Sequence, residues 1–243
     1  MNKQYDVIVV GGGHAGCEAA HASARLGSKT LLITMKLDGI GQMSCNPAIG
    51  GIGKSHLARE VDALDGLMCK AADEASLQSR VLNASKGAAV RATRIQTCRD
   101  AYKKAIQREI LNHKSLTILQ STVQSFIFAS NEVNGVVMDT GEKIFSHSVI
   151  LTAGTFLDGV IHLGEKKFSS GRSGDKASIE LERFFSDNGF ATKRLKTGTP
   201  PRVDGRTLNY NKMEEQPGDI NPGRFSYLPS SPKLTKQRSC HVT

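Results

Sequence analysis

A cluster of glycines near the N-terminus has the spacing of a phosphate-binding turn. Gly11-Gly12-Gly13-His14-Ala15-Gly16 contains the G-x-G-x-x-G pattern, directly after the apolar run Tyr5 to Val10 and at the start of the Ala-rich segment His14 to Leu26. In a strand-to-helix turn, the first glycine permits the tight turn and the second lets the backbone approach a pyrophosphate. The third lets the helix pack on the sheet with its N-terminal dipole facing the anion. The pattern therefore predicts a dinucleotide-binding site.

One part of the dinucleotide pattern departs from the rule. An acidic residue that binds the ribose hydroxyls is expected about 20 residues after the glycines, at the end of the second strand. Ile33-Thr34-Met35-Lys36 occupies that place, and Thr34 offers only a weaker hydroxyl contact. These residues alone leave the choice between FAD and NAD open.

A cysteine in a polar, glycine-rich loop is a second candidate for chemistry. Cys45 lies in Gly41-Gln42-Met43-Ser44-Cys45-Asn46-Pro47, shortly before a predicted helix N-terminus. Such a setting favours the nucleophilic thiolate form of a cysteine. We therefore predict a chemical role for Cys45, with an inert loop cysteine as the alternative. By contrast, three cysteines on predicted helices are expected to be small buried apolar residues: Cys17, Cys69 and Cys98.

The segment Ala48 to Ser55 is a near match to the P-loop, with alanine in place of the first glycine. A P-loop follows a hydrophobic strand, whereas Ser44-Cys45-Asn46-Pro47 precedes this segment and predicts no strand. We therefore do not expect a nucleoside triphosphate site here. A loop that leads into a helix can still bind an anion or the edge of a flavin.

The charge of the chain indicates a polyanionic partner. The 243 residues have a formal net charge of +9, and residues 80–114 hold nine Lys and Arg residues against two acidic ones. Clustered cations gain affinity by releasing counterions from phosphates. Arg91, Arg94 and Arg99, beside the polar loop Asn83 to Gly87, are the candidate contacts, and a solvated helix face is the alternative. The segment shows no evident aromatic platform for base stacking.

Composition argues against several other classes of protein. Hydrophobic residues make up 39% and charged residues 23% of the chain, as in soluble globular domains. Neither a membrane span nor a secretion signal is expected, and five scattered cysteines without a C-x-x-C pair favour a reducing, cytoplasmic setting. The seven histidines have no metal-ligand spacing and no G-x-S-x-G elbow is present, so we expect no metal site and no serine hydrolase.

The order of predicted elements indicates an α/β fold. A strand over Thr30 to Thr34 completes a βαβ unit with the first strand and helix, and the helix ends at Gly27. Helical spacing returns at Leu57, Val61, Leu64 and Met68 and over residues 97–112, with a less regular basic stretch between the two. The remaining predictions are a small antiparallel meander from four short strands (116–120, 123–129, 133–139 and 143–145), a buried strand at 148–152, a helix at 178–188, and a proline-rich extended segment after Thr197.

Six segments of the chain together resemble one family. They are residues 6–18, 41–54, 82–87, 91–94, 151–159 and 195–202, and the block Ser44-Cys-Asn-Pro-Ala-Ile-Gly-Gly51 is specific to this group and its folate-dependent tRNA methyltransferase relatives. The segments resemble the glucose-inhibited division protein A family (MnmG), which modifies tRNA uridine with a 5-carboxymethylaminomethyl group. The resemblance covers essentially the whole chain, and the absence of an acid near Thr34 belongs to the pattern of that family.

The resemblance implies a Rossmann-like FAD-binding domain of the glutathione-reductase type and a specific chemistry. A one-carbon unit from methylenetetrahydrofolate and an amine, either ammonium or glycine, are joined at carbon 5 of the wobble uridine of certain tRNAs. NADH reduces the flavin. The GTPase MnmE completes the active complex, and the full-length protein forms a homodimer.

The resemblance also assigns roles to residues of this chain. Residues Gly11 to Gly16 would bind the FAD pyrophosphate, Val123 would meet the adenine side, and Ser178 would lie near the cofactor. Cys45 would be the catalytic thiol, supported by Lys54 and the helix N-terminus beside it. Whether Cys45 acts as a nucleophile toward uridine carbon 6 or as a proton donor stays open.

We expect residues 1–196 to form the FAD-binding domain, without its closing segment, and residues 197–243 to begin an inserted α/β domain. Relative to the family, the chain lacks a second cysteine implicated in catalysis, most of the NADH-contacting insertion and the helical part that binds partner and tRNA. Two alternatives remain. One is a folate- and FAD-dependent tRNA uridine methyltransferase, and the other is a truncated module that binds nucleotide or tRNA without turnover.

Overall fold

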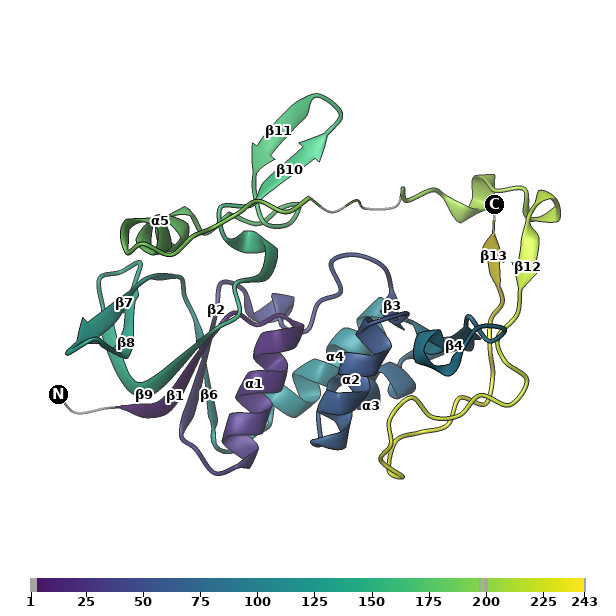
Figure 1. The fold of residues 1–243 in the computed structure, drawn as a ribbon, viewed down its shortest axis with the longest axis horizontal. Helices are drawn as coiled ribbons and strands as arrows, with labels where there is room; N and C mark the ends of the chain where they lie inside the picture. The colour runs from purple at the N-terminus through teal and green to yellow at the C-terminus, as the bar shows by residue number, and fades with distance from the viewer. Residues whose placement is uncertain (1–3, 197, 199–200, 243) are drawn as a thin grey trace. The chain divides into compact units, whose positions relative to one another are not determined.

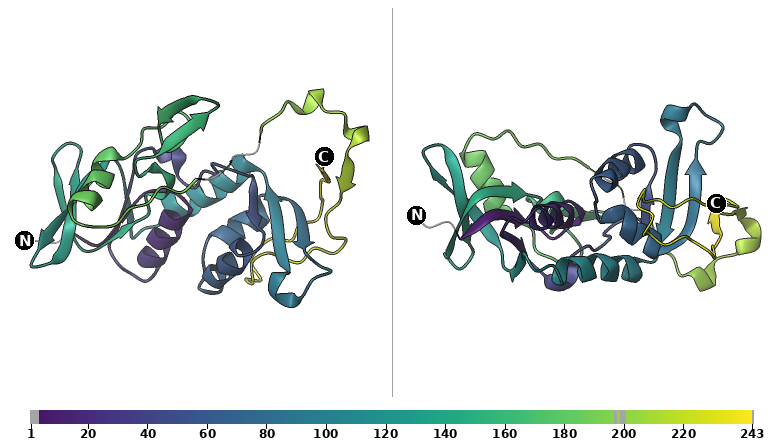
Figure 2. Two further views of the ribbon diagram at one scale, coloured as in Figure 1. Left: turned by 45° about the horizontal axis from the view of Figure 1, so that its top comes forward. Right: turned by 90° about the horizontal axis from the view of Figure 1, so that it is seen from below.

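The fold is taken from a computed structural model, which describes residues 4–196, 198 and 201–242. The chain forms two compact units, each built from two stretches of sequence. Unit 1 comprises residues 1–44 and 109–196, and unit 2 comprises residues 45–108 and 197–243 (Figures 1 and 2). The predicted division into domains at residue 196 stays a prediction.

The described residues form five α-helices and thirteen strands, joined by loops and short 3₁₀ turns. The helices are α1 (His14–Arg25), α2 (Lys54–Ala63), α3 (Met68–Glu74), α4 (Arg99–Leu111) and α5 (Ile179–Asp187). The strands are β1 (Tyr5–Val10), β2 (Thr30–Thr34), β3 (Ala48–Gly50), β4 (Ser76–Leu82), β5 (Ala92–Thr97), β6 (Leu116–Gln120), β7 (Val123–Ala129), β8 (Glu132–Met138), β9 (Lys143–Leu151), β10 (Val160–Leu163), β11 (Lys166–Ser169), β12 (Glu214–Gln216) and β13 (Cys240–Val242). None of the described helices is long and apolar enough to cross a membrane.

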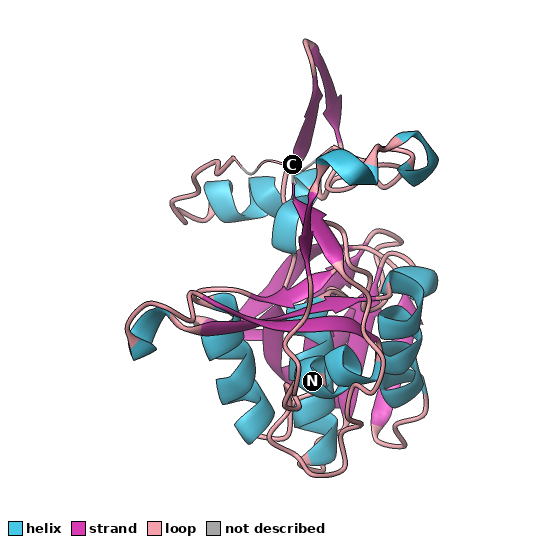
Figure 3. Cartoon of the chain, turned by 90° about the vertical axis from the view of Figure 1, so that its right-hand side faces the viewer, coloured by secondary structure: helices cyan, strands magenta, loops and turns pink. Residues whose placement is uncertain are grey.

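Unit 1 is organised by a six-stranded sheet with the strand order β6-β2-β1-β9-β8-β7. β6, β2, β1 and β9 run parallel, and β9, β8 and β7 run antiparallel. α1 crosses from β1 to β2 and packs on these strands, and it ends where Gly27 takes a positive φ of 91°. Figure 3 shows the helices (cyan) beside the strands (magenta). The α/β class and the βαβ unit are therefore confirmed.

Two strand predictions are corrected by β9. The sequence suggested separate strands at 143–145 and 148–152, but one continuous strand pairs with β8 through Lys143 to Phe145 and with β1 through Ser146 to Leu151. The polar residues Ser146, His147 and Ser148 interrupt the apolar pattern without ending the strand, because the backbone pairs with β1 there. The predicted meander is thus β7-β8-β9, and β6 instead pairs parallel with β2.

The main core of unit 1 lies on one face of this sheet. Its buried residues are Ile8, Val10, Leu31, Ile33, Val123, Val136, Met138 and Ile144. On the other face, Val9 and Leu32 are 0% exposed, beside the small residues of α1. Because both faces of β1 and β2 are covered, these strands are continuous apolar runs.

Unit 2 contains a three-stranded antiparallel sheet with the order β3-β5-β4. The residues of β4 and β5 were expected only as a less regular basic stretch, and this pair of strands was not predicted. β4 has the sequence Ser-Leu-Gln-Ser-Arg-Val-Leu, in which Gln78 and Ser79 are 0% and 3% exposed. Buried polar residues hide the alternation that predicts a strand, because their burial depends on partners far away in the sequence.

Those partners come from the segment after residue 197, which runs along the edge of β4 (Figure 2). Asp219 N donates to Ser79 O (2.9 Å) and Arg238 N donates to Leu77 O (2.9 Å). Gln78 Nε2 donates to Gln216 O (2.7 Å), and Ser79 N donates to Gln237 Oε1 (2.9 Å). The segment therefore satisfies backbone groups that an uncovered edge strand would leave unpaired.

Two buried carboxylates anchor the same segment to α2 and α3. Asp62 accepts hydrogen bonds from Ser226 Oγ (2.7 Å) and Tyr227 N (2.6 Å). Asp73 accepts from Phe225 N (2.8 Å), Ser226 N (3.0 Å) and Ser231 Oγ (2.7 Å). Burial raises the pKa of Asp73, and the three donors oppose that effect. Phe225, packed inside this turn, is 0% exposed.

We predict that Ser226→Ala destabilises the protein by about 1–3 kcal/mol, because the substitution leaves the buried Asp62 carboxylate with one donor fewer. Urea unfolding of the chain measures this change. Ser230→Ala is the matched control, since Ser230 is exposed and four residues away, and a change below about 0.5 kcal/mol is expected there. Equal effects of the two substitutions would contradict the anchoring role of Ser226.

Candidate functional site

The glycine turn lies between β1 and α1, as the sequence predicts. Gly11 has a φ of 110°, in the region that favours glycine. Gly11 N donates to Ile33 O (2.8 Å), which continues the pairing with β2. Gly13 is the N-cap residue of α1 and has no side chain to cap the first N–H groups of the helix. The helix start can therefore present backbone donors and a positive dipole to an anion.

The three glycines of the G-x-G-x-x-G pattern have different surroundings. A Cβ atom on Gly16 would lie 1.7 Å from Gly11 O, and a Cβ atom on Gly11 would lie 2.6 Å from Thr152 O. Gly16 is buried, whereas Gly13 is exposed and a Cβ atom there would meet nothing within 4 Å. Gly11 and Gly16 thus serve close packing, and Gly13 faces open space. This geometry fits a dinucleotide whose pyrophosphate lies against Gly13.

Thr152 supports the turn, a role that sequence reasoning did not assign. Its Oγ1 lies 2.9 Å from Val10 O and 3.1 Å from Gly11 O, and its backbone N donates to Val10 O (2.9 Å). Thr152 follows β9, which neighbours β1 in the sheet. In the sequence, this role could have been found from the position of Thr152, a threonine directly after a predicted strand and before Ala153-Gly154.

The end of β2 carries an ion-pair cluster where the sequence lacks the expected acid. Lys36 Nζ pairs with Asp175, and Arg172 Nε lies 2.7 Å from Asp175 Oδ2. The Asp175 side chain is 9% exposed. Burial acts to raise its pKa, but the hydrogen bonds and charges of Lys36 and Arg172 outweigh burial and hold the pKa below its ordinary value. The acid at this place therefore comes from a loop 139 residues further along the chain.

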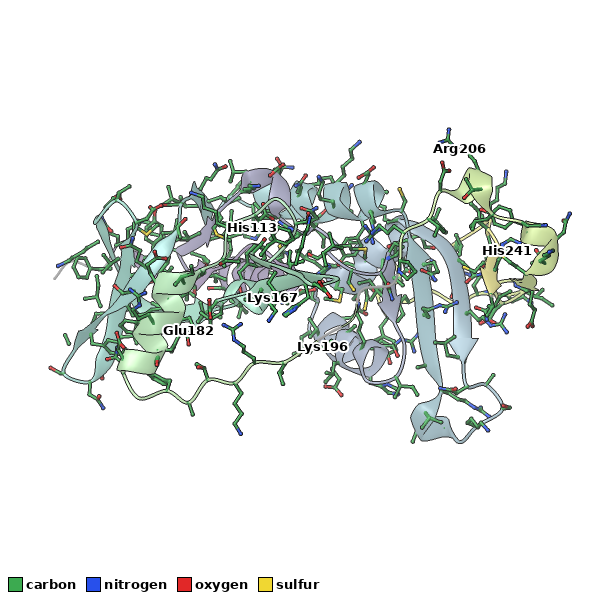
Figure 4. All side chains as sticks on the ribbon, turned by 90° about the horizontal axis from the view of Figure 1, so that it is seen from above. His113, Lys167, Glu182, Lys196, Arg206 and His241 are labelled. Atoms are coloured by element: carbon green, nitrogen blue, oxygen red, sulfur yellow. The ribbon has the colours of Figure 1, made fainter. Side chains whose placement is uncertain are left out.

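The other two predicted cofactor residues also lie in unit 1. Val123 begins β7, and the residue is 4% exposed within the core of unit 1. Ser178 is the N-cap residue of α5. Its backbone N donates to Phe156 O (2.8 Å), and its carbonyl accepts from Asp158 N (3.1 Å). The helix that follows Ser178 can be found in Figure 4 by the label of Glu182, which lies near the start of α5.

Cys45 is exposed, and its loop is held by cations of unit 2. Its carbonyl oxygen accepts from Arg99 Nη2 and from Arg202 Nη2 (3.1 Å). Lys54 Nζ donates to Ala48 O (3.1 Å), and its charge interacts with the Cys45 thiolate. Burial lowers the pKa of Lys54, whereas the Cys45 charge opposes this effect. Burial and the charge of Arg202 likewise lower the pKa of Arg99. Lys54, Arg99 and Arg202 thus place positive charge around the loop that carries Cys45.

The structure explains how Arg99 and Arg202 reach the loop. Thr97 N and Oγ1 donate to Pro47 O (2.7 and 3.2 Å), which fixes the loop to the end of β5, two residues before Arg99. Arg202 belongs to the segment after residue 197. Lys54 was predicted to support Cys45, whereas Arg99 was predicted only as a polyanion contact and Arg202 had no predicted role. The signal for Arg202 was its place in the motif 195–202.

The near match to the P-loop follows no strand, as expected, because residues 44–47 form none, but the segment itself contains a short strand that was not predicted. Ala48 to Gly50 form β3, which pairs antiparallel with β5. The strand was missed because it has only three residues and follows Pro47. Lys54 is directed back to the carbonyl of Ala48. Among the described residues, no three His, Cys, Asp or Glu side chains gather as a possible metal site.

The glycine turn and Cys45 belong to different compact units, with residues 11–16 and 123 and 178 in unit 1 and Cys45 and Lys54 in unit 2. The structure therefore brings together the residues within each group. The boundary between the two units falls between Ser44 and Cys45, so Cys45 is the first residue of unit 2.

The sheet order, the crossover helix and the glycine turn define a dinucleotide-binding type of α/β fold. The family model described as glucose inhibited division protein A matches residues 6–243, and the chain belongs to this family. The chain is similar to Aquifex aeolicus GidA in two crystal forms, both at 42% identity, with TM-scores of 0.93 and 0.92. The GidA-related protein from Thermus thermophilus shares the fold, with 20% identity, a TM-score of 0.56, and coverage of 76% of this chain and 68% of that chain.

The matches to Aquifex GidA cover 98% and 99% of this chain and 41% of the Aquifex chain. This chain thus spans about two fifths of the length of that relative. The predicted family and fold class are confirmed.

We predict that Gly16→Ala strongly destabilises unit 1, because the new Cβ atom would overlap the carbonyl of Gly11. A loss of about 2 kcal/mol or more is expected from such overpacking, measured by thermal or urea unfolding. Gly13→Ala is the matched control in the same turn. Its φ of −74° and ψ of −171° suit alanine, so the unfolding midpoint should stay close to that of the unchanged chain. A destabilised Gly13→Ala variant would contradict this assignment.

We predict that iodoacetamide alkylates Cys45 well before Cys17 and Cys69 in the folded protein. Cys45 is exposed, whereas Cys17 is 1% exposed and burial raises its pKa to about 12. The thiolate of Cys17 is therefore scarce below that pH. Peptide mass spectrometry after timed alkylation measures each site.

Removing a cation near the thiol should slow this reaction. Arg99→Met should lower the alkylation rate of Cys45 at neutral pH severalfold, because a thiolate loses a nearby positive charge. Lys104→Met, on the exposed side of α4, is the control and should leave the rate unchanged. Equal rates in the Arg99 variant and the unchanged chain would show that Arg99 has no influence on the thiol.

Proposed function

We propose that this chain is the FAD-binding part of a flavin-dependent enzyme that modifies tRNA. The observation that carries the proposal is the glycine turn in a chain that belongs to the glucose inhibited division protein A family. Gly13 faces open space at the N-terminus of α1, where the FAD pyrophosphate would lie. Gly11 to Gly16 would bind the pyrophosphate, Val123 would meet the adenine side, and Ser178 would lie near the cofactor.

The proposed reaction joins an aminomethyl or carboxymethylaminomethyl group to carbon 5 of the wobble uridine. The flavin, when bound, supplies hydride chemistry after reduction by NADH, and methylenetetrahydrofolate supplies the one-carbon unit. Cys45 is the proposed catalytic thiol, supported by the charges of Lys54, Arg99 and Arg202. It acts either as a nucleophile toward uridine carbon 6 or as a proton donor. The proposed partners are tRNA, MnmE and a second copy of the full-length protein, in the cytoplasm.

We predict that the chain binds FAD and that Gly13→Ala weakens this binding about tenfold or more, because a methyl group would occupy the space of the pyrophosphate. The measurement is a titration of flavin fluorescence quenching, followed by the visible spectrum of the protein after gel filtration. Cys45→Ser is the control and should bind FAD as the unchanged chain does. Failure of the folded, unchanged chain to bind FAD would contradict a flavin site formed by these residues alone.

Cys45→Ser tests the chemical role. Its rate of tRNA modification should fall by about two orders of magnitude or more, since a catalytic group that transfers a proton or bond contributes at least that much. Mass spectrometry of tRNA nucleosides measures the product. Cys98→Ser, at a half-buried cysteine between β5 and α4, is the matched control. Full modification by the Cys45 variant would remove this thiol from the mechanism.

A further inference from the structure

Unit 2 contains a cavity that is lined by residues other than those proposed to act in the reaction. Its volume is about 590 Å³. α2 lines it with His56, Arg59 and Glu60, β5 with Thr93, and the preceding turn with Arg91. The segment after residue 197 contributes Tyr227. Two arginines and one tyrosine thus line the same cavity.

Arg59 is held in place but keeps unused hydrogen-bonding capacity. Its guanidinium carbon lies 5.5 Å from the centre of the Phe225 ring and 5.3 Å from that of Tyr227. Within the part of the chain that the structure describes, its buried Nε has no hydrogen-bond partner. A buried donor without a partner costs free energy, whereas cation–π contacts leave the in-plane N–H groups to an acceptor. Arg59 therefore has a hydrogen-bond donor available for an anion.

Arg91 supplies the second guanidinium. Its Nε donates to Lys86 O (3.1 Å), so the side chain is tied to the polar loop between β4 and β5. Arginine presents a planar fork of donors that matches the oxygens of a phosphate group. Glu60 is the acidic side chain of the lining, so the two arginines outnumber it and leave an excess of positive charge.

Tyr227 adds an aromatic surface. It is 63% exposed, although its backbone N is fixed by a 2.6 Å hydrogen bond to the buried Asp62. An exposed ring on a rigid backbone is a suitable platform for a nucleobase, and such stacking tolerates any base. Glu60 can accept a hydrogen bond from a sugar hydroxyl. The segment 80–114 shows no such platform in the sequence, because the ring comes from a distant part of the chain.

We propose that this cavity binds a nucleoside phosphate, with Arg59 and Arg91 on the phosphate and the base against Tyr227. The ligand is either a free nucleotide or one nucleotide of an RNA strand, since both offer the same chemistry. An RNA strand as the source rests on the proposed tRNA function, whereas a free nucleotide does not.

The test uses the whole chain and three probes at one fixed, low ionic strength: a labelled single-stranded RNA octamer, uridine monophosphate and inorganic phosphate. Fluorescence anisotropy measures RNA binding, and calorimetry measures the two small ligands. Arg59→Met and Arg91→Met should each weaken binding of the RNA or nucleotide about tenfold. Tyr227→Leu should weaken both about fivefold or more and leave binding of inorganic phosphate unchanged. Lys104→Met removes the same charge outside the cavity and should change affinity less than about twofold.

Binding of the nucleotide by itself would identify a free nucleotide as the ligand, and binding of RNA without the nucleotide would identify an RNA strand. The proposal is overturned if neither probe binds the unchanged chain, or if the Arg59 and Arg91 variants behave like Lys104→Met. Circular dichroism and the unfolding midpoint show whether each variant is folded, and Arg59→Lys serves as a milder second variant, expected to weaken binding less than Arg59→Met. FAD titration of the same variants keeps the two proposals apart, because it should be unaffected by changes in this cavity.

Discussion

The close approach of α1 to the turn after β1 is the constraint on which unit 1 depends. The backbone of Gly16 lies so near the carbonyl of Gly11 that no side chain fits between them. This contact sets the angle at which the helix leaves the sheet, and so aims its N-terminus at the space beside Gly13. Thr152 then fixes the carbonyls of Val10 and Gly11 from the neighbouring strand. Packing and the proposed phosphate site are thus two consequences of one arrangement of backbone.

Unit 2 depends on a different kind of constraint, the burial of the carboxylates of Asp62 and Asp73. Burying two acids is unfavourable unless donors surround them. The turn from Phe225 to Ser231 supplies these donors from its backbone and hydroxyl groups. The same turn places Phe225 and Tyr227 against Arg59. A polar anchor in the interior therefore decides which side chains line the cavity.

Positive charge has two distinct uses in unit 2. Arg99 and Arg202 meet at the carbonyl of Cys45, where they hold the loop of the candidate thiol. Arg59 and Arg91 face a cavity instead, one of them backed by aromatic rings. The basic excess that the composition shows is thus partly structural and partly available to a ligand. The number of charges along the chain does not distinguish a structural arginine from one that can bind a ligand, since the role of each depends on which group its guanidinium contacts in the folded chain.

Much of unit 1 could be predicted from the sequence because its signals are local. An apolar run, a glycine turn, an Ala-rich helix and a second apolar run are contiguous, and each is determined by backbone sterics and burial within a few residues. The motif also located Cys45 in an exposed loop.

Tertiary structure alone decided the rest. β4 and β5 were missed because the partners of Gln78 and Ser79 lie near residues 216 and 237. Asp175 at the end of β2, Arg202 at Cys45 and Tyr227 beside Arg59 likewise come from distant segments. The sequence by itself determined the fold class, the family and the glycine turn between β1 and α1. Long-range hydrogen bonds and ion pairs decided which charges surround the thiol and the cavity, because their free energy depends on partners that only the folded chain brings within reach.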